Sequence, residues 1–255
     1  MQQLIQERLK ALEKERNITI LYACESGSRA WGFASPNSDW DVRFVYAHSM
    51  DWYLQINEQK DQIDLDIDAN ELDLSGWELR KLLRLFARSN ASPFEWLQSP
   101  IVYADPYHFK ETLWALQAAY FKPKAVAYHY LGLAKNAAKK GLQDGLMDIK
   151  KYFYVLRPLL AAYWICDQQT VPPMEFAPLL EQIKDETALY EAIQALTAKK
   201  IAAMEGDKTT PVPIIQAFIE QQLATLGAQT VNLPAHSPTS EALNNLFRTT
   251  LKNIS

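Results

Sequence analysis

The stretch that decides the fold is residues 25–44, ESGSRAWGFASPNSDWDVRF. A continuous apolar run at 18–24 precedes it and predicts a buried strand, followed by a glycine-serine turn and a polar loop. Asp39 and Asp41 are two residues apart, so on a strand they lie on one face. The alternative is a solvated turn, because Ser-Pro-Asn-Ser-Asp is rich in turn formers. The mainly apolar segment 42–46 directly afterwards favours the strand.

The residue types in this stretch predict a site for a metal and a phosphate. Two neighbouring carboxylates repel each other unless a cation lies between them, and hard oxygen ligands favour Mg²⁺, which also binds substrate phosphates. Gly27 and Ser28 form a tight turn whose backbone N–H groups can approach a phosphate. Arg43 shares the carboxylate face, where it either binds a triphosphate or balances the acidic pair.

The next segments predict a further strand and a helix. Residues 63–68, IDLDID, alternate strictly and predict a strand with one acidic face. Ser75 and Glu78 have capping-box spacing, which predicts a helix from there to about residue 88. Asp73 is expected where a strand gives way to that helix. Its carboxylate either joins the metal site or stabilises the positive helix end. Asn90 either contacts a ligand or caps the preceding helix.

The pattern changes near residues 100–106, and everything beyond shows helical spacing. We therefore expect a domain boundary there, with domains at 1–105 and 106–255. Residues 110–160 hold nine Lys or Arg and three Asp or Glu, against three and seven in 171–207. A basic segment in a protein of net charge −4 is either a phosphate-facing surface or a solvated helix face.

One predicted helix of the basic segment carries cations beside an aromatic ring. Lys150, Tyr154 and Arg157 fall on one stripe, with Lys151 beside it. Rings stack on bases and cations meet phosphates, so this stripe could bind a nucleotide. The alternative is a helix–helix seam with charged rims. We expect the stripe to face the 27–41 loop across the domain cleft, because the acidic catalytic segment otherwise offers only Arg29 and Arg43 as cations.

Composition excludes several classes of protein. Two cysteines in 255 residues are too few for a disulfide framework or a zinc site, and Cys24 is expected to be a buried small residue. The longest apolar run is too short to span a bilayer, and no signal peptide is visible, so the cytoplasm is the expected location and a membrane is not an expected partner.

These motifs resemble the DNA polymerase β-like nucleotidyltransferase superfamily, whose signature is glycine-serine, about ten residues, Asp-x-Asp and a third acid on a later strand. The wider chain is similar to RlaP, a family of predicted nucleotidyltransferases associated with RNA repair. The matching stretches are GSRAWG at 27–32, LDLSGWELRK at 72–81, SN at 89–90, EWL at 95–97 and KKYFYVLRP at 150–158.

The resemblance implies an α+β protein, with a small mixed-sheet nucleotidyltransferase domain followed by an all-helical domain. It implies transfer of an NMP from a nucleoside triphosphate to an acceptor hydroxyl, with an RNA 3′ end as acceptor and Mg²⁺, or Mn²⁺, as cofactor. The alternatives are AMP transfer to a protein or small molecule, and a non-catalytic nucleotide-binding module.

The expected site residues follow from the residue patterns and from the family resemblance together. The third metal-binding carboxylate is expected to be Asp73, with Asp66 and Asp64 as the fallbacks. The catalytic and metal-binding residues are then Asp39, Asp41 and Asp73, and the nucleotide-binding residues are Gly27, Ser28, Arg29, Arg43, Lys151, Tyr154 and Arg157.

Overall fold

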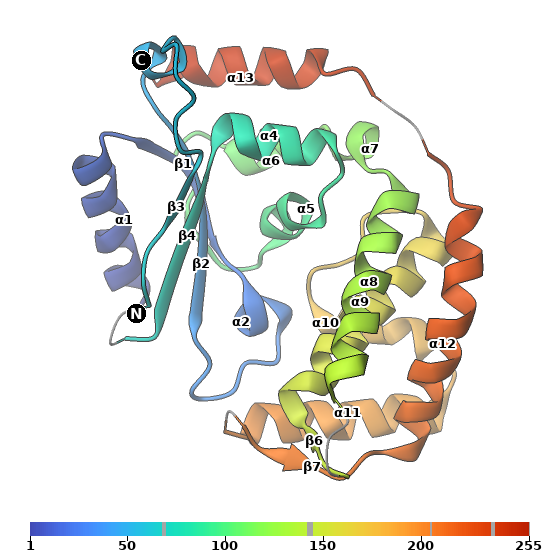
Figure 1. Ribbon diagram of the computed structural model, residues 1–255. Helices are drawn as coiled ribbons and strands as arrows, with labels where there is room; N and C mark the ends of the chain where they lie inside the picture. Colours follow the sequence, from blue (N-terminus) through green and yellow to red (C-terminus); the bar gives the residue numbers. More distant parts are fainter. Residues whose placement is uncertain (68–69, 142–144, 205, 236–237, 255) are drawn as a thin grey trace. The chain divides into compact units, whose positions relative to one another are not determined.

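A computed structural model describes residues 1–67, 70–141, 145–204, 206–235 and 238–254 (Figure 1). The chain divides into two compact units. The sheet unit consists of Met1–Gly27, Asp39–Tyr120 and Ser237–Ser255, and the helical unit consists of Ser28–Ser38 and Phe121–His236. These units do not follow the expected boundary after residue 105, since the chain crosses between them more than once.

The sheet unit contains a five-stranded mixed sheet with the order β3-β4-β2-β1-β5. β1 pairs antiparallel with β2 and β5, β4 pairs antiparallel with β3, and the central pair β2 and β4 is parallel. The strand predicted to carry Asp41 and residues 42–46 is confirmed as β2. The bounds are β1 (Thr19–Glu25), β2 (Trp40–Ala47), β3 (Gln62–Asp64), β4 (Leu72–Glu78) and β5 (Val102–Ala104).

One face of this sheet forms the hydrophobic core with α1 (Gln2–Arg16). Ile5, Leu9 and Leu12 lie on one side of the helix at helical spacing, and all three are buried. They pack in one cluster with Val42 and Phe44 and with other strand residues of this face. Because successive strand residues point to opposite faces, Asp41 and Arg43 lie on the other face of β2.

The predicted helix start at Ser75 is wrong. β4 continues to Glu78, because seven residue pairs join it to β2 in parallel register and satisfy its backbone. Helix α4 (Leu79–Ala87) starts afterwards, and the Glu78 carboxylate caps it by accepting hydrogen bonds from the Arg80 and Lys81 amides. Asp73 is therefore six residues before the helix, so the alternative in which it stabilises a helix end is also wrong.

The predicted strand at 63–68 is shorter in the structure, where β3 ends at Asp64. Asp68 lies outside the described residues. Asn90 caps the following helix rather than the preceding one, since its side chain accepts from the Ser92 amide at 3.0 Å. The remaining helices of the sheet unit are α3 (Met50–Tyr53), α5 (Ala91–Gln98), α6 (Phe109–Trp114), α7 (Gln117–Tyr120) and α13 (Glu241–Asn253).

Helix α13 belongs to the sheet unit although it closes the chain. It contacts α4, and in Figure 1 it lies beside that helix. The Phe247 ring meets the Tyr53 ring edge-on at 5.2 Å, and the Tyr120 hydroxyl donates to the Thr239 carbonyl at 2.7 Å. The C-terminal segment therefore completes the sheet unit, which sequence periodicity alone did not predict.

The helical unit is built around α8 and α9, which α12 covers. Its α9 begins at Ile149, after a two-residue strand β6 that pairs with β7. The unit is thus not wholly helical. Its elements are α8 (Pro123–Gly141), β6 (Met147–Asp148), α9 (Ile149–Gln168), α10 (Phe176–Leu180), η1 (Glu181–Ile183), α11 (Thr187–Ala202), β7 (Lys208–Thr209) and α12 (Pro213–Val231).

The loop between β1 and β2 passes into the helical unit. Phe33 is buried and its ring lies 4.7 Å from that of Phe153 and 5.5 Å from that of Phe176. The buried Lys200 ammonium donates to the Ser35 hydroxyl at 3.0 Å. Phe33 and Ser35, in the middle of the stretch that first indicated the fold, are therefore held by side chains more than a hundred residues later in the helical unit.

The expected α+β class is confirmed, with a mixed sheet in the first unit and mostly helices in the second. Among the described residues, no helix has both the length and the apolar character needed to cross a membrane.

Candidate functional site

The candidate site lies on the sheet face opposite α1, where the two central strands begin. Asp41 is the second residue of β2 and Asp73 is the second residue of β4. The parallel register pairs them directly. Adjacent strands are about 4.8 Å apart, so two in-register carboxylates on one face are close neighbours. The sheet therefore brings together the second acid of the Asp-x-Asp motif and the predicted third acid.

Arg43 binds both carboxylates. Its Nη2 donates to Asp73 Oδ2 at 2.8 Å and to Asp41 Oδ1 at 3.2 Å. Its Nη1 donates to the carbonyls of Val42 at 3.1 Å and Asp73 at 3.3 Å. The arginine thus balances the charge of the acidic pair, which is one of the two roles expected for it. The three side chains are 20–29% exposed, so the cluster is open to solvent.

Gly27 lies directly against this cluster. Its φ is +59°, in the left-handed region where glycine is favoured. A Cβ at this position would come within 1.9 Å of Asp41 Oδ2. No other residue fits here without displacing the carboxylate. The glycine of the motif therefore allows its backbone to approach Asp41, while Arg43 contacts the other oxygen of the same carboxylate.

A buried glutamate that the sequence analysis did not single out holds the backbone of Asp41. Glu25 is fully buried, its Oε1 accepts from the Asp41 amide at 2.9 Å, and its Oε2 accepts from the Tyr103 hydroxyl at 2.5 Å. The Ser26 amide donates to the Asp41 carbonyl at 2.8 Å. The only sequence signal was an acid at the end of an apolar run, just before the glycine.

The other predicted acids are placed differently. Asp39 is half-buried and lies just before β2, where the chain re-enters the sheet unit. Asp64 is opposite Ser75 on the neighbouring strand, and its carboxylate accepts from Ser75 and Gln62. These hydrogen bonds lower the pKa of the Asp64 carboxyl. Asp66 follows the end of β3 and is exposed. Of the three candidates for the third carboxylate, Asp73 is the one paired with Asp41.

The donor chemistry of this cluster suits a divalent cation, but the observed cation is Arg43. Carboxylate oxygens are the ligands that Mg²⁺ prefers. Over the residues that the structure describes, no group of three or more Asp, Glu, His or Cys side chains could hold a metal as arranged. Asp41 and Asp73 fit a metal only if the guanidinium that now joins them moves away.

Cys24 lies beside this cluster in sequence and is opposite Arg43 in the sheet. It is fully buried, as expected, and burial raises the pKa of its thiol to about 12. The thiol therefore stays protonated at neutral pH and does not supply a nucleophile.

The remaining predicted residues belong to the helical unit. Arg157 is buried, and its guanidinium lies 4.5 Å from the centre of the Trp31 ring and donates twice to the Met174 carbonyl, at 2.9 and 3.2 Å. Tyr154 is 43% exposed and meets Trp31 edge-on at 6.3 Å. The predicted stripe therefore contacts the part of the 27–41 loop that belongs to this unit.

Both lysines of the stripe are half-buried, whereas Arg157 is buried. The Lys150 ammonium lies 5.9 Å from the centre of the Tyr154 ring, and Lys151 is half-buried. Ser28 and Arg29 lie in the short helix α2 (Gly27–Trp31), where a turn was expected. Arg29 Nη2 donates to the Ser38 carbonyl at 2.6 Å and so ties the ends of the loop together.

Comparison with known proteins agrees with the resemblance. The model of the RlaP family, described as the RNA repair pathway DNA polymerase beta family, matches residues 1–249. A Bacillus subtilis (strain 168) protein, "Uncharacterized protein YcgL", is 42% identical over 256 residues, covering 100% of this chain and 98% of that protein.

A solved structure from Exiguobacterium sibiricum 255-15, titled as a nucleotidyltransferase-like protein, is 10% identical, with a TM-score of 0.35 over 96% of this chain and 80% of that chain. That likeness is too weak to support an assignment. The family match and the Bacillus relative both extend over nearly the whole sequence. The chain therefore belongs to the RlaP family, the RNA repair pathway DNA polymerase beta family.

Proposed function

We propose that this chain transfers a nucleoside monophosphate from a nucleoside triphosphate to an acceptor hydroxyl, with an RNA 3′ end as acceptor. The observation that carries the proposal is the direct pairing of Asp41 with Asp73, with the Gly27 backbone against the same carboxylate. The family described by the matching model works in RNA repair, which favours RNA over other acceptors.

In the proposed reaction the acceptor oxygen forms a bond to the α-phosphorus. The bond between that phosphorus and the bridging oxygen to the β-phosphate breaks, and pyrophosphate leaves with the electron pair. The carboxylate of Asp73 accepts or directs the proton of the attacking hydroxyl. The backbone N–H groups of Gly27 and Ser28 approach the β- and γ-phosphates, and the absence of a side chain on Gly27 lets this backbone lie against Asp41.

A divalent cation, Mg²⁺ or Mn²⁺, would be held by Asp39, Asp41 and Asp73. When bound it would supply charge stabilisation for the phosphates and the leaving group. Arg43 then has to release the two carboxylates, and we propose that its guanidinium turns to the phosphates of the nucleotide. Arg43 would then first balance the acidic pair and afterwards bind the triphosphate, which are the two roles that the sequence leaves open for it. Lys151, Tyr154 and Arg29 are proposed nucleotide contacts, and Arg157 is proposed to position Trp31 and Tyr154.

One observation favours a second candidate, a nucleotide-binding module without catalysis. Arg43 already neutralises Asp41 and Asp73, and an acidic pair held in this way has no need of a metal. In that case the protein would bind a triphosphate without consuming it. A transferase consumes the triphosphate and a binding module does not, so the labelling experiment described next separates the two candidates.

The experiment is incubation of the purified chain with each α-³²P-labelled nucleoside triphosphate, Mg²⁺ and a mixture of RNAs, with the products separated by size and chemistry. Label on RNA supports the proposal. Label on the protein or on a small molecule would replace the proposed acceptor, and binding without release of pyrophosphate would support the non-catalytic candidate. Asp51→Asn, at an exposed aspartate in α3, is the matched control for Asp41→Asn.

A further inference from the structure

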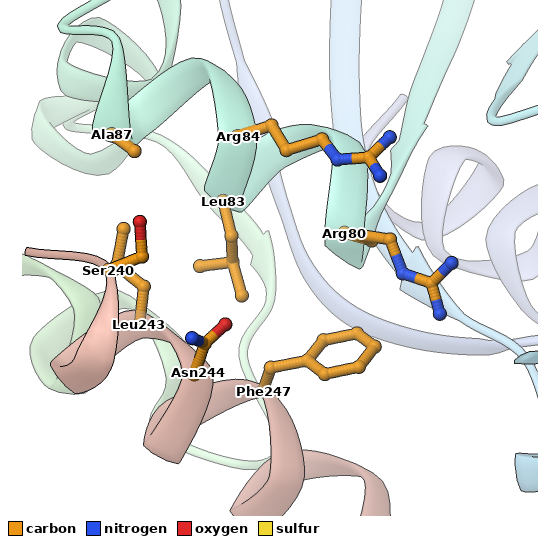
Figure 2. Close-up of a pocket in the computed structure, with 8 residues that line it drawn as sticks. All are labelled: Arg80, Leu83, Arg84, Ala87, Ser240, Leu243, Asn244 and Phe247. Carbon is orange, nitrogen blue, oxygen red and sulfur yellow. The ribbon is translucent and has the colours of Figure 1, made fainter.

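A hollow lies in the sheet unit, between α4 and α13 (Figure 2). It has a volume of about 240 Å³, smaller than a typical pocket for a drug-sized ligand at roughly 300–1,000 Å³. Both helices contribute apolar side chains, and α4 adds two arginines from successive turns. It is lined by Arg80, Leu83, Arg84, Ala87, Ser240, Leu243, Asn244 and Phe247.

Arg80 is fixed in position by aromatic rings. Its guanidinium lies 5.0 Å from the centre of the Tyr53 ring and 5.4 Å from the centre of the Phe247 ring. The Tyr53 hydroxyl is in turn held by the Glu78 carboxylate at 2.5 Å. Cation–π contacts of this kind hold the arginine without using its N–H donors, which stay available for an acceptor.

Arg84 is one helical turn further and is exposed. In the part of the chain that the structure describes, its guanidinium forms no ion pair. Figure 2 shows the guanidinium groups of Arg84 and Arg80 extending toward the same side of α4. Like charges at this spacing repel each other, so an anion between them would be stabilising.

Acidic side chains from neighbouring segments also lie near the two arginines. A smaller adjacent hollow, of about 130 Å³, shares both arginines and is also lined by Glu58, Asp61 and Glu78. Asp61 pairs with Lys81, and the Glu78 carboxylate accepts from Tyr53 and two backbone amides. Residues 79–88 hold four basic and no acidic side chains, so the helix surface is cationic.

We propose that this hollow binds a phosphorylated nucleoside, either as a free nucleotide or as one unpaired nucleotide of RNA. The phosphate is bound by the guanidinium groups of Arg80 and Arg84, because planar guanidinium donors match phosphate oxygens. The base packs on Phe247 and the apolar wall of Leu83 and Leu243. Asn244 and Ser240 supply the hydrogen-bonding groups that a sugar or base edge requires.

This site is distinct from the acidic cluster. Asp73 is at the start of β4 and Arg80 follows the end of the same strand. The five steps from Asp73 to Glu78 correspond to about 17 Å along an extended strand. The second site is therefore too far away to be part of the first, and its binding does not depend on Asp41.

The test is calorimetric titration of the full chain, in metal-free buffer, with AMP, ribose 5-phosphate and the RNA pentamer A₅. It is carried out in wild type and in Asp41→Asn, which removes a carboxylate of the acidic cluster. Arg84→Gln should weaken AMP binding about 10- to 100-fold, the loss expected for a charged hydrogen bond. Arg88→Gln is the matched control, since Arg88 is exposed on the same segment but does not line the hollow. Phe247→Leu should remove the preference for AMP over ribose 5-phosphate.

AMP binding that survives Asp41→Asn and is lost in Arg84→Gln supports the proposal independently of the catalytic assignment. Tighter binding of A₅ than of AMP identifies RNA as the source of the nucleotide, and equal binding identifies the free nucleotide. Absence of binding by AMP and A₅ at millimolar concentration, or equal affinity in Arg84→Gln and wild type, would overturn it. Equal wild-type affinity for ribose 5-phosphate and AMP would overturn the base contact.

Discussion

Replacing Arg43 with glutamine should destabilise the sheet unit and make the protein responsive to divalent cations. The substitution removes both ion pairs and leaves Asp41 and Asp73 side by side without a counter-charge. Exposed ion pairs are worth about 0–1 kcal/mol, and breaking a buried one costs roughly 3–5 kcal/mol. With side chains 20–29% exposed, the cluster lies between these limits, so we expect a loss of about 2 kcal/mol in the free energy of unfolding.

The assay is thermal unfolding with and without Mg²⁺ or Mn²⁺. For a chain of this size about 1 kcal/mol corresponds to roughly 2–4 °C, so the melting temperature of Arg43→Gln should fall by about 4–8 °C in EDTA. A divalent cation should raise the melting temperature of Arg43→Gln by more than it raises that of wild type. The reason is that no guanidinium competes with the cation for the two carboxylates in the variant. Arg43→Lys should keep part of the stability, since an ammonium provides charge without the two-pronged geometry.

Arg88→Gln serves as the control for loss of one positive charge, and it should melt close to wild type. If Arg43→Gln and wild type have the same melting temperature in EDTA, the two ion pairs contribute nothing to the free energy of unfolding. An equal response of both proteins to metal would show that Arg43 does not occupy the position of the cation, and the exchange proposed above would then be wrong.

Gly27→Ala should lower the melting temperature and abolish nucleotidyl transfer, whereas Gly32→Ala, at positive φ with open space around it, should cost only backbone strain of roughly 1–2 kcal/mol; melting and label-transfer assays separate the two. Tyr103→Phe should destabilise the protein by about 1.5–3 kcal/mol in urea unfolding, because the buried Glu25 loses a hydrogen-bond donor. Burial lowers the pKa of His48 below its ordinary 6.5, so the unfolded state binds more protons there, and stability should fall as pH drops below about 6.5; His48→Gln should flatten this dependence in unfolding curves taken between pH 5 and 7.5.

The parts of the fold that follow local rules could be predicted from the sequence. Residues 40–44 alternate between apolar and charged side chains and the apolar run continues to Ala47, so a strand that carries Asp41 and Arg43 on one face was predicted from the sequence. Ser75–Glu78 has the spacing of a capping box, but tertiary pairing with β2 extends the strand and moves the cap to Glu78. A local capping signal stabilises a helix end less than seven backbone pairs stabilise a strand. Because the partner strand β2 lies about 30 residues away in sequence, these pairs could not be predicted from the local pattern.

In the candidate site, too, the features that follow local rules were predicted and those that depend on tertiary contacts were not. Asp41 and Asp73 are recognised by motif and by position, and their parallel register is a tertiary fact that supports the choice of Asp73 over Asp64. Arg43 was placed on the correct face by alternation, but its two carboxylate partners depend on strand order. Glu25 was missed because an acid at the end of a hydrophobic strand is normally solvated, and here the Tyr103 hydroxyl and a backbone amide take the place of water.

The most direct test of the central claim is a comparison of label transfer from α-³²P-labelled nucleoside triphosphate by wild type, Asp41→Asn, Asp73→Asn and the control Asp51→Asn. All four should be shown to melt as folded proteins before the comparison. The account predicts transfer by wild type and Asp51→Asn and loss of at least about a hundredfold in the other two, the scale of removing an electrostatic contributor to the transition state. Transfer by Asp41→Asn at the wild-type rate would contradict it.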